Sequence, residues 1–147
     1  MKGDWLMIYT EKTKKAMIIA YNAHNGQEDK SGVPYIFHPI HLAEQMETEE
    51  ECLVALLHDV IEDTWVTIEQ LQTEFSETVV EAVKLLTRDK SVDYMDYIRK
   101  IKPNPLARKV KLADLHHNSD PTRMENQTEK DIKRSEKYHK AIEILES

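Results

Sequence analysis

The chain has 147 residues, of which 40% are hydrophobic and 32% are charged, and its formal net charge is −7. This length suits one domain with its own core over residues 1–147, and the acidic balance argues against a general nucleic-acid binder. No run of about 18 apolar residues predicts a membrane span, and the N-terminus shows no secretion signal, so we expect a cytoplasmic protein.

The helical period dominates the chain, which has only three glycines and five prolines. It predicts an all-α fold of roughly eight helices. The first helix is expected over residues 5–24, followed by a loop over 25–35 and a short helix that starts near Pro39. The remaining helices are expected from Thr48 to Ile61, from Thr67, from Ser76 to Leu86, and over 91–101, 105–120 and 128–146. Capping boxes are predicted at Thr48 and Thr67.

One predicted helix carries charges inside an apolar stretch, A-L-L-H-D-V-I-E-D-T over residues 55–64. At helical spacing, Glu62 shares a face with His58 and Asp59, and Asp63 shares a face with Asp59. Three neighbouring acids repel each other, and a divalent cation would remove that conflict. On this stretch alone, a solvated helix end accounts for the charges equally well.

Two further segments place ionisable residues near apolar ones. In V-K-L-A-D-L-H-H-N, Asp114 shares a face with Val110 and Lys111, and His117 and Asn118 follow one turn later. His38 lies in P-Y-I-F-H-P-I beside a proline. Histidines with carboxylates suit a divalent transition metal such as manganese, iron or zinc. The single cysteine, Cys52, argues against a structural zinc site built on cysteine pairs.

Four ordered motifs, A-H-N-G-Q, K-S-G-V-P-Y-I-F-H-P, A-L-L-H-D-V-I-E-D-T and V-K-L-A-D-L-H-H-N, resemble the HD phosphohydrolase superfamily. The extended pattern is similar to the hydrolase domain of the RelA/SpoT alarmone enzymes, above all their small stand-alone versions. The resemblance covers residues 19–138. It implies a single HD-domain helical bundle, a site for Mn²⁺ or another divalent transition metal, and removal of the 3′-diphosphate from a guanosine polyphosphate, (p)ppGpp, to give GDP or GTP.

The resemblance also implies roles for individual residues. It implies four metal ligands: His38, His58, Asp59 and Asp114. It implies that Glu62 and Asp63 handle the attacking water. It implies that five residues contact the small-molecule nucleotide: Lys30, Ser31, Asn118, Arg134 and Tyr138. A homo-oligomer is left open.

Asp29 departs from the family pattern, because relatives commonly carry an arginine near the base at this position. A carboxylate beside Lys30 should disfavour a polyanion, so Asp29→Arg is expected to lower the KM for guanosine bis(diphosphate). The departure keeps two alternatives open. One is an HD phosphohydrolase of another nucleotide, such as a deoxynucleotide or a phosphorylated dinucleotide cofactor. The other is a non-catalytic nucleotide sensor.

Overall fold

A computed structural model describes residues 5–123 and 127–147 of the chain. The described residues form helices and connecting loops, with an isolated antiparallel bridge between Glu28 and Pro34. The helices are α1 (Glu11–Ala23), α2 (Phe37–Glu44), α3 (Glu49–Leu57), α4 (Val60–Asp63), α5 (Ile68–Glu74), α6 (Glu77–Leu86), α7 (Tyr94–Ile101), α8 (Pro105–Asn118), the 3₁₀ helix η1 (Pro121–Arg123) and α9 (Glu129–Glu146). The predicted all-α class is therefore confirmed.

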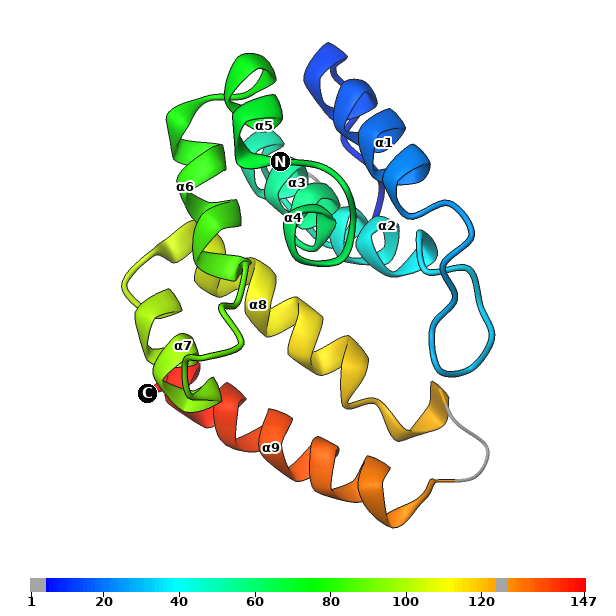
Figure 1. Ribbon diagram of the computed structural model, residues 1–147, viewed down its shortest axis with the longest axis vertical. Helices are drawn as coiled ribbons and strands as arrows, with labels where there is room; N and C mark the ends of the chain where they lie inside the picture. The colour runs from blue at the N-terminus through cyan, green and yellow to red at the C-terminus, as the bar shows by residue number, and fades with distance from the viewer. Residues whose placement is uncertain (1–4, 124–126) are drawn as a thin grey trace.

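Helix α3 lies at the centre of the fold, in contact with α1, α2, α6 and α8 (Figure 1). Residues Cys52 to Leu57 are all buried, so this helix is apolar on every side, as expected for a helix packed among others. Burial of this run drives the packing of the surrounding helices, since each large apolar side chain contributes roughly 1.5–3 kcal/mol. The core that results holds both ends of α3 in place, including the C-terminal end that carries His58.

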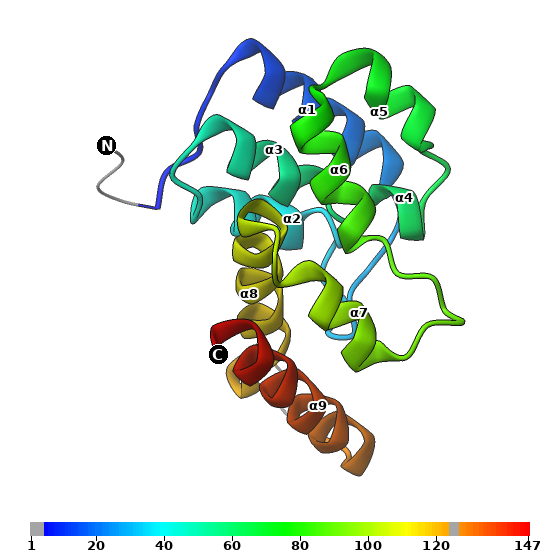
Figure 2. The ribbon, with the colours of Figure 1, turned by 90° about the vertical axis from the view of Figure 1, so that its left-hand side faces the viewer.

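Helices α8 and α9 pack against each other below the α1–α6 layer, and α7 contacts both (Figures 1 and 2). Helix α8 also contacts α2 and α3, so its buried residues face both halves of the molecule. Within the described residues, no helix is both long enough and apolar enough to cross a membrane.

Side-chain caps account for most of the helix starts. Thr67 forms the predicted capping box with Gln70, and Ser76 accepts a hydrogen bond from the N–H of Val79. Thr48 caps α3 by accepting from the N–H of Glu51, but the reciprocal half of the box differs. The carboxylate of Glu51 accepts from the N–H of Glu47 instead.

Several predicted boundaries differ from those of the structure, including the end of α8 at Asn118 rather than at residue 120. Helix α1 begins at Glu11, after a capping box at Thr10, so residues 5–9 precede it without helical structure. Helix α2 begins at Phe37, before Pro39, and α7 begins at Tyr94, where Asp93 accepts from the N–H groups of Met95 and Asp96. The predicted helix from Thr48 to Ile61 is broken into α3 and α4 at His58 and Asp59.

The loop between α1 and α2 folds into a tight hairpin. Tyr35 N–H donates to the Gln27 carbonyl at 2.8 Å, and Asp29 N–H donates to the Val33 carbonyl at 2.8 Å. Gly32 occupies the turn with φ +81°, a conformation that residues with a Cβ rarely adopt. This hairpin carries Lys30 and Ser31 toward the end of α8.

Candidate active site

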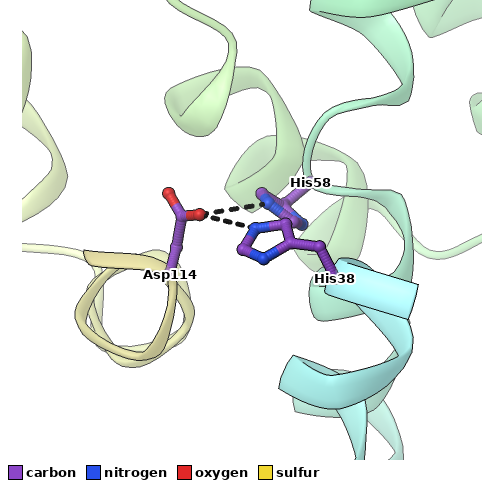
Figure 3. Close-up of side chains that lie close together, drawn as sticks. All are labelled: His38, His58 and Asp114. Carbon is purple, nitrogen blue, oxygen red and sulfur yellow. Dashed lines mark hydrogen bonds and ion pairs between the residues drawn. The ribbon is translucent and has the colours of Figure 1, made fainter. Parts of the chain in front are cut away.

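Three predicted metal ligands meet at the junction of α2, α3 and α8. Figure 3 shows His38, His58 and Asp114 pointing toward one another from these three elements, and each offers a ligand atom within 4.8 Å of the others. One oxygen of Asp114, Oδ1, lies 2.8 Å from His38 Nε2 and 3.7 Å from His58 Nε2. All three residues are buried, so the cluster is shielded from bulk water.

The tautomer of His58 is fixed by its position at the C-terminal end of α3. Its Nδ1 lies 2.7 Å from the carbonyl of Ala55, which can only accept, so Nδ1 carries the proton and donates. The lone pair is then on Nε2, which is buried and makes no hydrogen bond, although the carboxylates of Asp59 and Asp114 lie 3.1 and 3.7 Å away. A buried nitrogen without a partner is costly, and metal-binding histidines typically donate their other N–H to a carbonyl in this way. The donor set and the unpartnered Nε2 therefore fit a divalent transition metal.

His38 has a comparable outer partner in His117. The two Nδ1 atoms lie 2.7 Å apart, and the two rings stack with centroids 4.9 Å apart. Burial, together with the neighbouring His38 and Arg123, lowers the pKa of His117 to about 4, so His117 is neutral near pH 7. The Nδ1 of a neutral His117 can accept a hydrogen bond from His38 Nδ1–H, which leaves His38 Nε2 available to a metal.

The second oxygen of Asp114 is held by a half-buried lysine. Lys111 Nζ donates to Asp114 Oδ2 at 2.9 Å, and Asn118 Nδ2 donates to Oδ1 at 3.0 Å. Burial alone would raise the pKa of Asp114, but the charge of Lys111 and the neighbouring imidazoles of His38 and His58 hold it well below the usual range. The carboxylate is therefore charged and oriented, as a metal ligand must be.

Asp59 lies beside the cluster rather than within it. Its Oδ2 is 3.1 Å from His58 Nε2 and accepts a short hydrogen bond from the hydroxyl of Tyr35. Burial opposes ionisation, but His58 and these hydrogen bonds lower the pKa of Asp59 to about 2. The charged carboxylate of Asp59 and the imidazole of His58 could therefore bind the same cation. This arrangement is consistent with Asp59 as the expected fourth ligand.

Glu62 and Asp63 follow in α4 at the accessible side of the cluster. Glu62 Oε1 accepts from the N–H of Arg88 at 2.6 Å, and the carbonyl of Asp63 accepts from Gln27 Nε2 at 3.0 Å. Partial desolvation, with Asp59 adding to it, raises the pKa of both carboxyl groups. Carboxylates with raised pKa values are better suited to take up a proton near neutral pH.

All five residues expected to contact substrate line one cavity of about 310 Å³: Lys30, Ser31, Asn118, Arg134 and Tyr138. Tyr35 also lines it and connects it to the cluster through Asp59. Three of the five already have hydrogen-bond partners within the protein. Ser31 Oγ donates to the Arg123 carbonyl at 2.8 Å, Arg134 donates to Asp131 at 3.0 Å, and Asn118 donates to Asp114 at 3.0 Å. The structure thus brings together hairpin, α8 and α9 residues that are up to 108 positions apart in sequence.

Several residues of the site were not assigned a role from the sequence: Tyr35, Lys111, His117 and Arg123. A signal existed for two of them, because Lys111 and His117 lie three residues before and after Asp114 and therefore share its helix face. Tyr35 and Arg123 act across 24 and 94 positions, through Asp59 and Asp29, and no local pattern reveals such pairs.

Known proteins resemble this chain in sequence and in fold. The chain is 37% identical to the bifunctional (p)ppGpp synthase/hydrolase SpoT of Escherichia coli strain K12, over 74% of this chain and 18% of that protein. It is 39% identical to a guanosine-3′,5′-bis(diphosphate) 3′-pyrophosphohydrolase of Vibrio cholerae, over 62% of this chain and 14% of that protein. The chain thus spans less than a fifth of these two relatives.

A solved structure matches over almost the whole chain. It is described as a metazoan ortholog of SpoT that hydrolyses ppGpp, and it superposes with a TM-score of 0.75 at 25% identity. The match covers 95% of this chain and 88% of that one. The family model of the HD domain matches residues 16–133, well over half of the sequence. Together with the His/His/Asp cluster, this match shows that the chain belongs to the HD domain family.

Proposed function

We propose that this protein is a metal-dependent phosphohydrolase that removes the 3′-diphosphate of (p)ppGpp and releases pyrophosphate with GDP or GTP. The observation that carries the proposal is the single cavity lined by the five expected substrate residues, which adjoins the His38, His58 and Asp114 cluster through Tyr35. The names and titles of the relatives support the choice of substrate. A nucleotide substrate of this kind supports a cytoplasmic location.

The residues of the cluster would hold the ion. We propose Mn²⁺, or another divalent transition metal, bound by His38, His58, Asp59 and Asp114. This donor set of imidazoles and carboxylates suits a borderline metal better than Mg²⁺ or Ca²⁺, which prefer oxygen ligands alone. When bound, such an ion polarises a phosphoryl group and lowers the pKa of a bound water.

The chain itself would position the reactants and move the proton. Water adds to the phosphorus attached to the ribose 3′ oxygen, the bond between that phosphorus and the 3′ oxygen breaks, and the 3′ oxygen takes up the proton that the water gives up, so that it leaves as a hydroxyl. Glu62 and Asp63 accept the proton of the attacking water, a role that their raised pKa values favour. Lys30 and Arg134 supply positive charge to the diphosphates, and Asn118 orients the nucleotide near Asp114.

A panel of nucleotides tests the proposal. Guanosine 3′,5′-bis(diphosphate), deoxynucleoside triphosphates and a 2′-phosphorylated dinucleotide cofactor are incubated with the protein and Mn²⁺, and released phosphate and pyrophosphate are measured. We expect pyrophosphate from the guanosine compound. Release from another member of the panel instead would favour the alternative nucleotide hydrolase, and binding without release from any would favour the sensor.

A Glu62→Gln variant separates the chemistry from the metal. Its turnover should fall by about 10² or more, the scale of acid–base assistance, while its metal content stays equal to that of the unmodified protein. Asp114→Ala should lose the metal as well as the activity. Unchanged turnover in Glu62→Gln would remove Glu62 from the reaction, and full metal occupancy in Asp114→Ala would remove Asp114 from the ligands.

A further inference from the structure

Arg123, at the end of η1, has its guanidinium fixed in the wall of the cavity. Its NH2 group donates to Asp29 Oδ2 at 3.0 Å, and its NH1 group donates to the carbonyl of His117 at 3.0 Å. The side chain is only 26% exposed. Donors on both terminal nitrogens are therefore used within the protein, by the hairpin on one side and by the end of α8 on the other.

The groups that hold Arg123 are themselves held. Asp29 Oδ1 accepts from the N–H of Ser31 at 2.8 Å and from the N–H of Val33 at 3.0 Å, so the carboxylate cannot rotate freely. The carbonyl of Arg123 accepts from Ser31 Oγ at 2.8 Å. The hairpin and η1 are thus joined through both the backbone and the side chain of Arg123, which fixes the plane of the guanidinium.

This arrangement suits a flat ring better than a phosphate. An arginine that binds phosphate turns its N–H donors toward the phosphate oxygens, often two at once. In Arg123 the nearby carboxylate of Asp29 offsets the charge, and two donors point to protein acceptors. The faces of the guanidinium are then left to meet a ligand. A planar cation stacks on an aromatic base through such a face.

The other charged groups of the cavity also separate a side suited to phosphates from the side near Arg123. Partial burial lowers the pKa of Lys30, and the nearby cations Arg134, Lys130 and Lys137 lower it further against the opposing carboxylate of Asp131. Positive charge for phosphates is thus concentrated on the side of Lys30 and Arg134. The side near Arg123 carries the carboxylates of Asp29 and Asp120, which disfavour a phosphate there.

We propose that Arg123 is the platform on which the nucleobase of the substrate stacks, and that Asp29 is the residue that positions this platform. The inference rests on the proposed function insofar as it takes the ligand to be a nucleotide. The base lies in the cavity against the face of the Arg123 guanidinium, and the phosphates extend toward Lys30 and Arg134. Arg123 is thereby a residue that determines nucleotide affinity without taking part in the chemical step.

Two substitutions distinguish stacking from charge. Arg123→Lys keeps the charge and loses the plane, whereas Arg123→Gln loses the charge and keeps a planar amide that can still donate to the His117 carbonyl. The dissociation constants of GDP and of inorganic pyrophosphate are measured by calorimetry on the full chain with Mn²⁺. Arg99→Lys, on an exposed arginine of α7, is the matched control.

We expect Arg123→Lys to weaken GDP binding about tenfold, within the range of one stacked base, and Arg123→Gln to weaken it less. Pyrophosphate affinity and the control should not change. The reverse order of the two variants, an equal loss for pyrophosphate, or unchanged GDP binding in Arg123→Lys would each overturn the platform. The same holds if the unmodified protein does not bind GDP.

The binding test of the Arg123 platform can fail independently of the hydrolysis test of the proposed function. If guanosine bis(diphosphate) is hydrolysed but Arg123→Lys leaves GDP binding unchanged, the platform alone fails. If no pyrophosphate is released but GDP binding depends on Arg123 as expected, the reaction alone fails. Asp29→Asn, which keeps a side-chain oxygen for the hairpin but loses the charge, should reproduce part of the loss in GDP affinity.

Discussion

His117 illustrates how a residue outside the expected ligand set can govern the metal. We expect His117→Ala to lower the affinity for Mn²⁺ by about 10- to 100-fold, because His38 would lose the acceptor that orients its ring. Competition with a chelator measures the affinity. His116→Ala is the control, since the neighbouring His116 is exposed. Equal affinity in both variants would mean that the contact between His38 and His117 has no role in metal binding.

The contacts of Asp29 reverse the direction in which Asp29→Arg is expected to change the KM. The sequence suggested a free carboxylate at the cavity rim, so that Asp29→Arg would lower the KM. In the structure both oxygens are engaged, by two N–H groups of the hairpin and by Arg123. An arginine there would lose these bonds and stand beside Arg123. We now expect the KM for guanosine bis(diphosphate) to rise several-fold.

The measurement is a pair of Michaelis curves. Because the change acts on binding, the kcat should change little. Asp120→Arg, which adds the same charge at another residue of the cavity lining, is the control for electrostatics alone. A lower KM in Asp29→Arg would restore the original expectation and would contradict the structural role of Asp29.

At the scale of helices, the sequence predicted those ends that depend on local chemistry. Thr67, Ser76 and Pro105 mark starts that the structure confirms, because a cap bonds only to the first turn of its own helix. The start of α1 was missed because Ile8 packs against the core without being helical, so apolar spacing extended the pattern too far.

The break between α3 and α4 was missed for a different reason. Helical spacing continues unchanged through His58 and Asp59, and the break coincides with contacts from distant residues. Asp59 precedes α4 without capping it, because its carboxylate bonds to Tyr35. The same limit applies to the site: the motifs indicated which residues belong to it, but the pairing of His38 with His117 requires the packing of α2 against α8.

The start of α3 provides a pH test. Burial would raise the pKa of Glu51, but hydrogen bonds from Lys109 and from the N–H of Glu47 outweigh it and hold the pKa below its usual value. The carboxylate therefore stabilises the fold above the unfolded pKa, and this contribution is lost as the pH falls through the folded pKa. Glu51→Gln should cost up to about 1 kcal/mol at pH 7, since the pair is partly exposed.

Thermal melts from pH 7 to pH 3 measure the effect. The difference in Tm, about 2–4 °C at pH 7, should shrink below pH 4.5 as the carboxyl group of the unmodified protein takes up a proton. Glu50→Gln is the control, because Glu50 is an exposed acid in the same first turn. A difference that stays constant down to pH 3 would exclude the charge of Glu51 as its cause.

At the scale of the whole molecule, the cluster joins elements that are otherwise held by packing. His38, His58 and Asp114 come from α2, the end of α3 and α8, so a bound ion would link both layers of the fold. An ion at 100 times its dissociation constant stabilises the folded state by about 2.7 kcal/mol. We expect a chelator to lower the Tm by about 5–10 °C, a shift measured by scanning calorimetry.

His38→Ala should show no such shift, because it lacks one of the ligands. Equal shifts in the two proteins would place the ion elsewhere.

The extent of the domain stays a prediction: one cooperative transition over residues 1–147 is expected, since α9 contacts both α7 and α8.

The end of α3 at His58 has a consequence for recognising such sites in other sequences. Neighbouring residues in an unbroken helix point about 100° apart, so helical geometry alone does not aim a His-Asp pair at one point. Here both residues lie in the turn between α3, which ends at Leu57, and α4, which begins at Val60, and Asp59 Oδ2 comes within 3.1 Å of His58 Nε2. A search for this dipeptide therefore becomes more selective when it also requires a helix that ends at the pair. Lengthening α3 by one residue through this junction would leave the dipeptide intact and dismantle the geometry.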